Sequence, residues 1–255
     1  MNKNLKYQTA AITGGLGDIG KAICLAFARN GTSIALCDIR PSEEAAAFLS
    51  LLGDSCGVEC TYHQVDVADP NQVKSWLGVV SGQLGIPNVV VANAARVTLA
   101  PALEITPEQW NQEINVNLNG AFYMIQEAAR LMVNGGIPGH MVLIGSWAAH
   151  QVHLDMPAYS VAKAALRMLC KCMALELAPK GILVNEVAPG YVQAGLSGKI
   201  WKERPDLCEQ AAARVPTGNF ISPEAVAEEV LHLCRPENRN ITGSTLLMDG
   251  GLSLS

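Results

Sequence analysis

Segments with a strand-like pattern alternate with segments with a helix-like pattern along the whole chain, and this alternation constrains the fold more than any other feature. Strands that alternate with helices form a parallel sheet with helices packed against its faces. We expect strands at 7–13, 33–37, 59–65, 88–92, 139–145, 181–187 and 245–248. We expect helices at 18–29, 42–52, 70–82, 106–133, 157–178 and 222–234.

A single hydrophobic core accounts for the whole chain. With 255 residues, of which 49% are hydrophobic and 16% charged, the chain can bury one large core. No repeat, low-complexity segment or Pro/Gly/Ser-rich linker divides it. We therefore expect residues 1–255 to form a single α/β domain, a doubly wound parallel sheet with helices on both faces.

Charge and apolar patterning exclude several kinds of partner. The net charge of −5 comes without long runs of one sign, so the chain has no basic footprint for nucleic acid. The N-terminal residues lack a signal peptide's apolar core, and no apolar stretch approaches the roughly 18 residues that span a bilayer. The 8 cysteines include no Cys-x-x-Cys, which favours free structural cysteines and no metal site. We expect a cytoplasmic protein without membrane or nucleic-acid partners.

A glycine-rich turn from Thr13 to Gly20 leaves the first expected strand and enters the first expected helix. Backbone amides and the helix dipole at such a turn hold a pyrophosphate. Asp18 lies in the first helical turn, where a carboxylate repels phosphate. We expect its side chain to point away from the pyrophosphate while its backbone stays near the cofactor.

Asp38 ends the second expected strand, where a carboxylate accepts hydrogen bonds from the adenosine ribose and repels a 2′-phosphate. This position favours NAD over NADP. Two alternatives stay open: Asp38 caps a loop instead, or Arg40 offsets part of the repulsion.

Tyr159 and Lys163 are four residues apart and share one helix face. A phenol with an ordinary pKa of about 10 is mostly protonated at neutral pH, and a nearby ammonium lowers that pKa. With Ser146 at the end of a strand and Asn117 further upstream, the pair forms a candidate acid/base site.

Further motifs run nearly from end to end of the chain. They are TGGLGDIG at 13–20, Asp38, Asp66-Val67, ANAA at 92–95, NVNLNGAF at 115–122, the Ser146, Tyr159 and Lys163 set, VNEVAPG at 184–190 and ITGSTLLMDGG at 241–251. At these residues the chain resembles the short-chain dehydrogenase/reductase family of NAD(P)-dependent oxidoreductases. The resemblance implies a Rossmann-like fold and hydride transfer between NAD and a secondary alcohol or carbonyl.

The resemblance also implies residue roles. Tyr159 would be the general acid/base, Lys163 would lower its pKa and bind the nicotinamide ribose, Ser146 would orient the substrate oxygen, and Asn117 would hold a proton-relaying water. The cofactor would be bound by Gly14, Leu16, Asp18, Ile19, Asp38, Asp66, Val67, Asn93, Tyr159, Lys163, Pro189, Gly190 and Val192. Ala194 stands where family members commonly have a threonine, so one hydroxyl contact to the cofactor is absent.

Polar residues around the expected pocket favour a small polar substrate. Arg96 follows ANAA, and His153 lies in the loop between Ser146 and Tyr159. The candidate substrate contacts are Arg96, Ser146, His153 and Tyr159. The segment 191–220 carries several glycines and predicts a lid. We therefore expect a sugar, polyol or hydroxy acid.

The helices at 106–133 and 157–178 resemble the family's paired interface helices, which implies a homo-oligomer, with a tetramer expected. Two other functions stay open. One is an NADP-dependent 3-oxoacyl-type carbonyl reductase; the other is a nonenzymatic nucleotide-sensing protein on the same fold.

Overall fold

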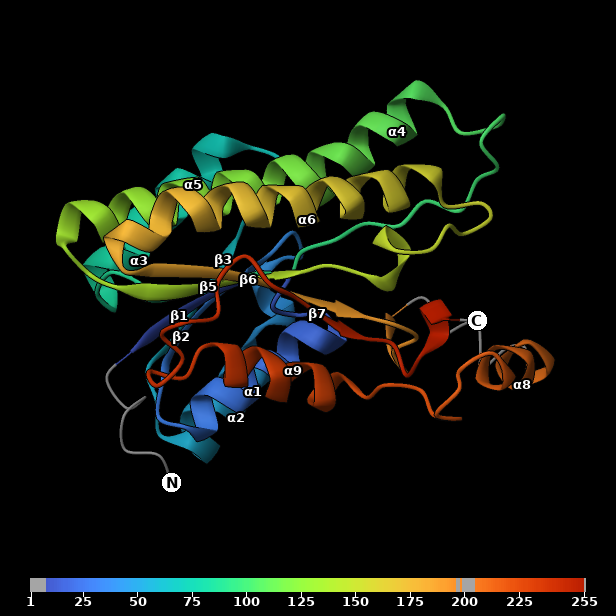
Figure 1. The fold of residues 1–255 in the computed structure, drawn as a ribbon. Coiled ribbons are helices and arrows are strands. Elements are labelled where there is room, and N and C mark those ends of the chain that lie inside the picture. Colours follow the sequence, from blue (N-terminus) through green and yellow to red (C-terminus); the bar gives the residue numbers. More distant parts are fainter. Residues whose placement is uncertain (1–7, 196–197, 199–204, 255) are drawn as a thin grey trace.

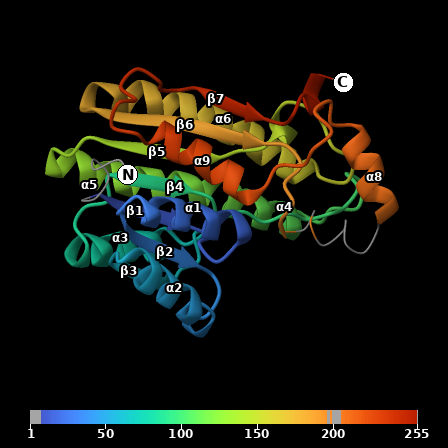
Figure 2. The same ribbon diagram turned by 90° about the horizontal axis from the view of Figure 1, so that it is seen from below.

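A seven-stranded parallel sheet forms the centre of the computed structural model, which describes residues 8–195, 198 and 205–254. Its strand order is β3-β2-β1-β4-β5-β6-β7, and Figure 2 shows this succession across the molecule. The strands are β1 Thr9–Thr13, β2 Ser33–Asp38, β3 Cys60–Gln64, β4 Val89–Ala92, β5 Gly139–Ile144, β6 Ile182–Pro189 and β7 Thr245–Met248. The fold class predicted from the sequence is confirmed, with strand ends shifted by at most two residues.

Helices cover both faces of the sheet (Figure 1). The face drawn below the sheet carries α1 Asp18–Arg29, α2 Ala46–Cys56 and α9 Pro223–Leu233. The face above it carries α3 Pro70–Gln83, α5 Ala121–Gly135 and α6 Pro157–Leu177. One hydrophobic cluster lies on each side of the sheet, because the buried central strands point alternate residues to opposite faces.

The strand order reverses direction between β1 and β4, where successive crossovers go to opposite sides. Neighbouring strand ends diverge at such a point and leave a crevice at their carboxyl ends. The register pairs Ile12 of β1 with Leu36 of β2 and with Val91 of β4, so the three strands end close together.

The helix expected over 106–133 is interrupted. α4 Pro107–Ile114 begins with a capping box between Thr106 and Gln109, and a π-helical turn at Asn115–Gly120 then precedes α5. Apolar periodicity cannot reveal one extra residue in a turn, and such π-turns are frequent at functional sites. Asn117 lies in this turn.

Two other helices differ from expectation. The helix expected at 42–52 is a short 3-10 turn, Ser42–Glu44, followed by α2 four residues later than predicted. The expected lid contains a helix the sequence did not predict, α8 Pro205–Ala213, whereas residues 196–197 and 199–204 of that lid lie outside the described residues. In the part of the chain described, no helix is both long and apolar enough to cross a membrane.

Candidate active site

A cleft of about 670 Å³ lies at the carboxyl ends of the strands. It is lined by the glycine turn, the ends of β2, β4, β5 and β6, and the start of α6. Every predicted site residue lines it except Leu16 and Asn117. The strand ends therefore bring together residues that are far apart in the sequence.

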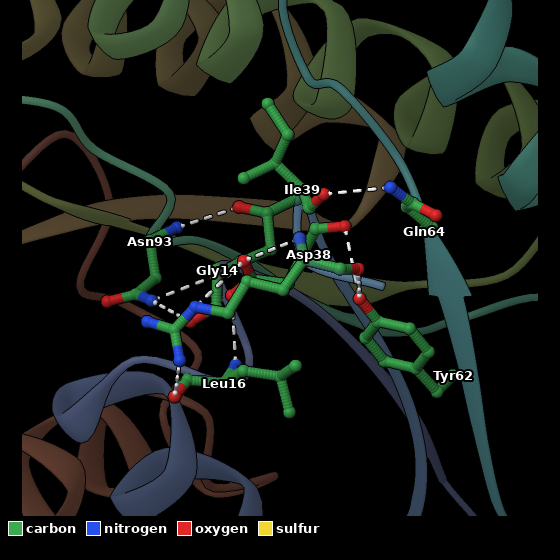
Figure 3. Close-up of polar contacts among 9 residues, drawn as sticks. Gly14, Leu16, Asp38, Ile39, Tyr62, Gln64 and Asn93 are labelled. Atoms are coloured by element: carbon green, nitrogen blue, oxygen red, sulfur yellow. Dashed lines mark hydrogen bonds and ion pairs between the residues drawn. The ribbon is translucent and has the colours of Figure 1, made fainter. Parts of the chain in front are cut away.

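Close packing explains the glycines of the turn. Gly14 has a φ of +64°, and a Cβ there would lie 2.9 Å from Cα of Ala94. A Cβ on Gly20 would collide with the carbonyl oxygen of Gly14, so the first turn of α1 can pack directly on the loop. The side-chain Nδ2 of Asn93 donates hydrogen bonds of 3.0 Å to the carbonyls of Thr13 and Gly14 (Figure 3). The turn is thus rigid, and the amino end of α1 faces the cleft and suits a pyrophosphate.

Asp38 both lines the cleft and holds the glycine turn. Its Oδ2 accepts a 3.1 Å hydrogen bond from the backbone amide of Leu16 (Figure 3). Its Oδ1 lies 3.7 Å from Nε of Arg40, whose Nη1 donates to the carbonyl of Leu16. The loop-holding alternative therefore describes a real contact of Asp38, and the cation of Arg40 lies beside its carboxylate.

The carboxylate of Asp18 is bound to the loop that follows β6. Its Oδ2 accepts a 2.7 Å hydrogen bond from the amide of Gly195, beyond the end of β6. The carboxylate thereby joins the first turn of α1 to the beginning of the segment 191–220.

Ser146, Tyr159 and Lys163 come together on one wall of the cleft. Ser146 follows β5, and its hydroxyl is hydrogen-bonded to the phenol of Tyr159. Lys163 Nζ donates a 2.7 Å hydrogen bond to the carbonyl of Ile144 and lies 5.5 Å from the centre of the Tyr159 ring. The end of β5 therefore holds both partners of the tyrosine.

Burial controls the protonation of this pair. It raises the pKa of Tyr159, which the hydrogen bond from Ser146 lowers in part and the charge of Glu113 raises further. The expected lowering of the Tyr159 pKa by Lys163 is not seen in the protein alone, because burial of the phenol raises this pKa and the ammonium lies over the ring. Burial likewise lowers the pKa of Lys163, to about 8.

Asn117 holds the loop that follows β4. Its Oδ1 accepts from the amide of Arg96 at 2.7 Å, and its Nδ2 donates to the carbonyl of Arg96 at 2.8 Å. Glu113, one turn earlier, accepts a 2.9 Å hydrogen bond from the amide of Thr98. Both polar atoms of the Asn117 side chain are thus bonded to the backbone of Arg96, and these bonds place Arg96 at the cleft. Sequence reasoning missed Glu113, because a single carboxylate in a helix is expected to be exposed to solvent.

The cofactor residues predicted at the remaining strand ends also line the cleft. Asp66 and Val67 follow β3, and the Asp66 carboxylate accepts a hydrogen bond from the amide of Ala68. Gly190 follows β6, and its amide donates to the carbonyl of Met248. These contacts fix the backbone on both sides of the glycine turn.

Aromatic rings form a wall that sequence reasoning missed apart from His153. The ring centres of Trp147 and His153 are 4.2 Å apart, those of Trp147 and Tyr191 5.3 Å, and those of Tyr191 and Phe220 6.2 Å. Burial, together with the charge of Arg214, lowers the pKa of His153, which favours the neutral form of its ring. The position of Trp147 directly after Ser146 was the available signal.

Cysteine side chains take no part in this site. The eight cysteines are free; Cys170 is buried and Cys172 is exposed. Within the described ranges, no group of three or more His, Cys, Asp or Glu side chains could hold a metal ion.

The whole chain is similar to known oxidoreductases. The family model described as enoyl-(acyl carrier protein) reductase matches residues 15–253. L-xylulose reductase of Mesocricetus auratus is 34% identical over 98% of this chain and 98% of its own length. L-rhamnose-1-dehydrogenase of Scheffersomyces stipitis is 32% identical over 97% and 96%, respectively. A solved structure from Beutenbergia cavernae with bound NADP has a TM-score of 0.89 at 27% identity, covering 97% of each chain.

The chain belongs to the short-chain dehydrogenase/reductase family. It is an oxidoreductase with an NAD(P)-binding Rossmann-like fold, and its class of reaction is the interconversion of CH–OH and carbonyl groups. The hypothesis of a nonenzymatic nucleotide-sensing protein is not supported.

Replacing Asp18 with alanine removes the acceptor for the Gly195 amide. We expect hydrogen exchange at Gly195 to accelerate about fivefold, since a net hydrogen bond contributes roughly 1 kcal/mol. Asp18→Asn is the control, because it keeps a side-chain oxygen and should give a smaller change. Equal exchange rates in the alanine variant and the unmodified chain would contradict the hydrogen bond between Asp18 and Gly195.

Proposed function

We propose that this chain is an NAD-dependent dehydrogenase that oxidises a secondary alcohol of a sugar, polyol or hydroxy acid, or reduces the corresponding carbonyl. The observation that carries the proposal is the convergence of Ser146, Tyr159 and Lys163 on one wall of the cleft. Relatives named for L-xylulose and L-rhamnose support the substrate class.

The residues of the cleft fit a dinucleotide. There is no room for a side chain at Gly14 or Gly20, and glycine at these positions keeps the backbone amides of the turn accessible. Asp38 lines the cleft, where its carboxylate would bind the adenosine ribose. Asp66 and Val67 would border the adenine, whereas Pro189, Gly190 and Val192 would border the nicotinamide end. NAD supplies the hydride acceptor, and its positively charged ring favours an ionised phenol nearby.

Tyr159 would take the proton from the substrate hydroxyl in oxidation and return it in reduction. Ser146 would hydrogen-bond the same substrate oxygen, and Lys163 would bind the nicotinamide ribose beneath it. Asn117 would hold the relaying water with its backbone, because its side chain is bound to Arg96. The burial that raises the Tyr159 pKa also excludes water from the reacting atoms.

Replacing Tyr159 with phenylalanine keeps the ring but removes the exchangeable proton. We expect turnover to fall by at least about two powers of ten, with NADH binding, followed by fluorescence, largely retained. Tyr123→Phe, on α5 outside the cleft, is the matched control and should leave turnover unchanged. A Tyr159 variant that keeps more than a tenth of the activity on every substrate tested would overturn the assignment.

The proposal of NAD as the preferred cofactor rests on Asp38, whose carboxylate repels a 2′-phosphate. Arg40 lies beside it and acts in the opposite direction, and the structure from Beutenbergia cavernae contains NADP. The repulsion is expected to dominate because Asp38 is largely buried and held by Leu16, whereas Arg40 is half exposed.

Asp38→Ser should lower the ratio of kcat/KM for NAD to kcat/KM for NADP by at least about tenfold, because charges near the surface interact by a few kcal/mol. Arg40→Ala should raise the same ratio, since it removes the positive charge of this pair, which would attract the 2′-phosphate of NADP. Steady-state kinetics with both cofactors measures the two changes. Equal efficiency with both cofactors in the unmodified enzyme would refute the preference.

The aromatic wall, with Arg96 and His153, supports a small hydroxylated substrate. Aromatic rings can stack against the apolar faces of sugars, while polar side chains bind the sugar hydroxyls. The competing NADP-dependent 3-oxoacyl-type reductase is separated by a direct screen of sugars, polyols, hydroxy acids and 3-oxoacyl thioesters with each cofactor.

His153→Ala or Arg96→Ala should raise KM for a polyol about fivefold more than KM for cyclohexanol, because only the polyol uses the lost hydrogen bond of roughly 1 kcal/mol. His232→Ala, exposed at the end of α9, is the control and should change neither value. If apolar alcohols were the better substrates and both variants treated the two classes alike, the polar substrate would be wrong and the dehydrogenase assignment would stand.

We also propose that the segment 191–220 closes over the substrate and that the enzyme is a cytoplasmic homotetramer. Contacts of Tyr191 with Trp147 support the lid. Exposed apolar side chains on α6, Val161, Met168 and Leu175, support an interface on that helix, and the free cysteines are those expected of a reducing compartment.

A further inference from the structure

Glu186 is a fully buried carboxylate in the middle of β6. Its neighbours in the sheet are Leu143 of β5 and Thr245 of β7. Thr245 donates a 2.5 Å hydrogen bond to its Oε2, whereas Oε1 has no hydrogen-bond partner among the described residues. An isolated buried carboxylate is costly, so a counter-charge nearby is expected.

Gly145 makes room for this carboxylate. A Cβ at Gly145 would overlap Oε1 of Glu186, so the carboxylate lies against the backbone of this glycine. Gly145 stands between Ile144, whose carbonyl accepts the hydrogen bond from Lys163, and Ser146. Glu186 therefore lies directly behind the strand end that holds both partners of Tyr159.

Lys163 needs such a counter-charge. The ammonium is buried, and in the part of the chain described it forms a hydrogen bond to Ile144 but no ion pair. Two buried carboxylates act on it, Glu186 from β6 and Glu113 from α4. On its own helix, Tyr159 lies one turn before it.

Arg167 and Lys171 follow Lys163 at four-residue steps along α6, and their charges also act on Glu186. Glu186 is therefore a carboxylate on which all three cations act, and Lys163 is the most buried of the three.

We propose that Glu186 is a positioning residue of the reaction: its carboxylate keeps Lys163 charged and hydrogen-bonded to the end of β5, and Gly145 lacks a side chain to admit it. The role of Lys163 in turnover rests on the function proposed above. Glu186 differs from Glu113 in its reach, since Glu113 acts on both Tyr159 and Lys163, whereas Glu186 acts on Lys163.

The sign of the effect follows from the charge. Lys163 is effective as an ammonium, and that form is lost as pH rises through its pKa, about 8 in this protein. Removing the negative charge of Glu186 lowers this pKa. The alkaline limb of the pH profile, where activity falls as pH rises, should therefore move to lower pH. Removing Glu113 should lower the pKa of Tyr159 as well, and both limbs of the pH profile should move to lower pH.

The test is an NMR titration of Lys163 in protein labelled with ¹³C-lysine, its signal assigned with Lys163→Arg. Glu186→Gln keeps the shape and a partner for Thr245, and it should lower the Lys163 pKa by about one unit. Glu176→Gln, on the exposed side of α6, is the matched control and should leave it unchanged. An unchanged Lys163 pKa in Glu186→Gln would overturn the proposal.

A second variant covers the case in which Glu186→Gln does not fold. Glu186→Ala combined with Gly145→Ala removes the carboxylate and fills part of its space, and it should lower the Lys163 pKa in the same direction. The titration needs neither substrate nor turnover. Absence of dehydrogenase activity in the unmodified protein would therefore overturn the proposed function alone, whereas an unshifted Lys163 would overturn this inference alone.

Where activity is found, the pH dependence of kcat/KM gives the second readout. Glu186→Gln should move only the alkaline limb, and Glu113→Gln should move both limbs. A residue with a purely structural role would lower activity equally at all pH values, and that result would also count against the proposal.

Discussion

The constraint on which the rest of the structure depends is that parallel strands joined by helices all end at the same edge of the sheet. Parallel pairing places the carboxyl ends of all strands at one edge, and the reversal of strand order between β1 and β4 opens a crevice there. Four parts of the site stand at the ends of different strands and yet line one cleft: the glycine turn, Asp38, Ser146 and Gly190. The same topology packs α6 across the end of β5, which brings Lys163 to the carbonyl of Ile144.

Close approach of backbones is the second requirement of the site. Gly14, Gly20 and Gly145 each stand where a Cβ would meet backbone or a buried carboxylate. The first two glycines let a helix end and a loop pack within reach of a phosphate. The third lets a charge lie behind the wall formed by Ser146, Tyr159 and Lys163. Small residues therefore determine how closely the backbone packs at the cleft and which charges surround Lys163.

Much of the site could be predicted from the chain because it rests on local patterns. A strand, a glycine turn and a helix in succession predict a phosphate site, and Tyr159 with Lys163 on one helix face predicts an acid/base pair. The π-turn at Asn115–Gly120 could not be predicted, since it adds one residue to a turn without disturbing the apolar pattern. Nor could the contacts of Tyr191 with Trp147 and His153, because Tyr191 follows β6 and lies far from the other two in the sequence.

The sequence by itself determined the alternation of strands and helices, hence the parallel sheet, and the identity of the reactive groups. Tertiary structure alone decided how those groups are charged and oriented. Asp18 reaches an amide 177 residues away, and Glu186 lies behind Gly145 because β5 and β6 are neighbours. The pKa of Tyr159 is raised, not lowered, since the cost of burying a charge depends on everything packed around it, and no local pattern records that packing.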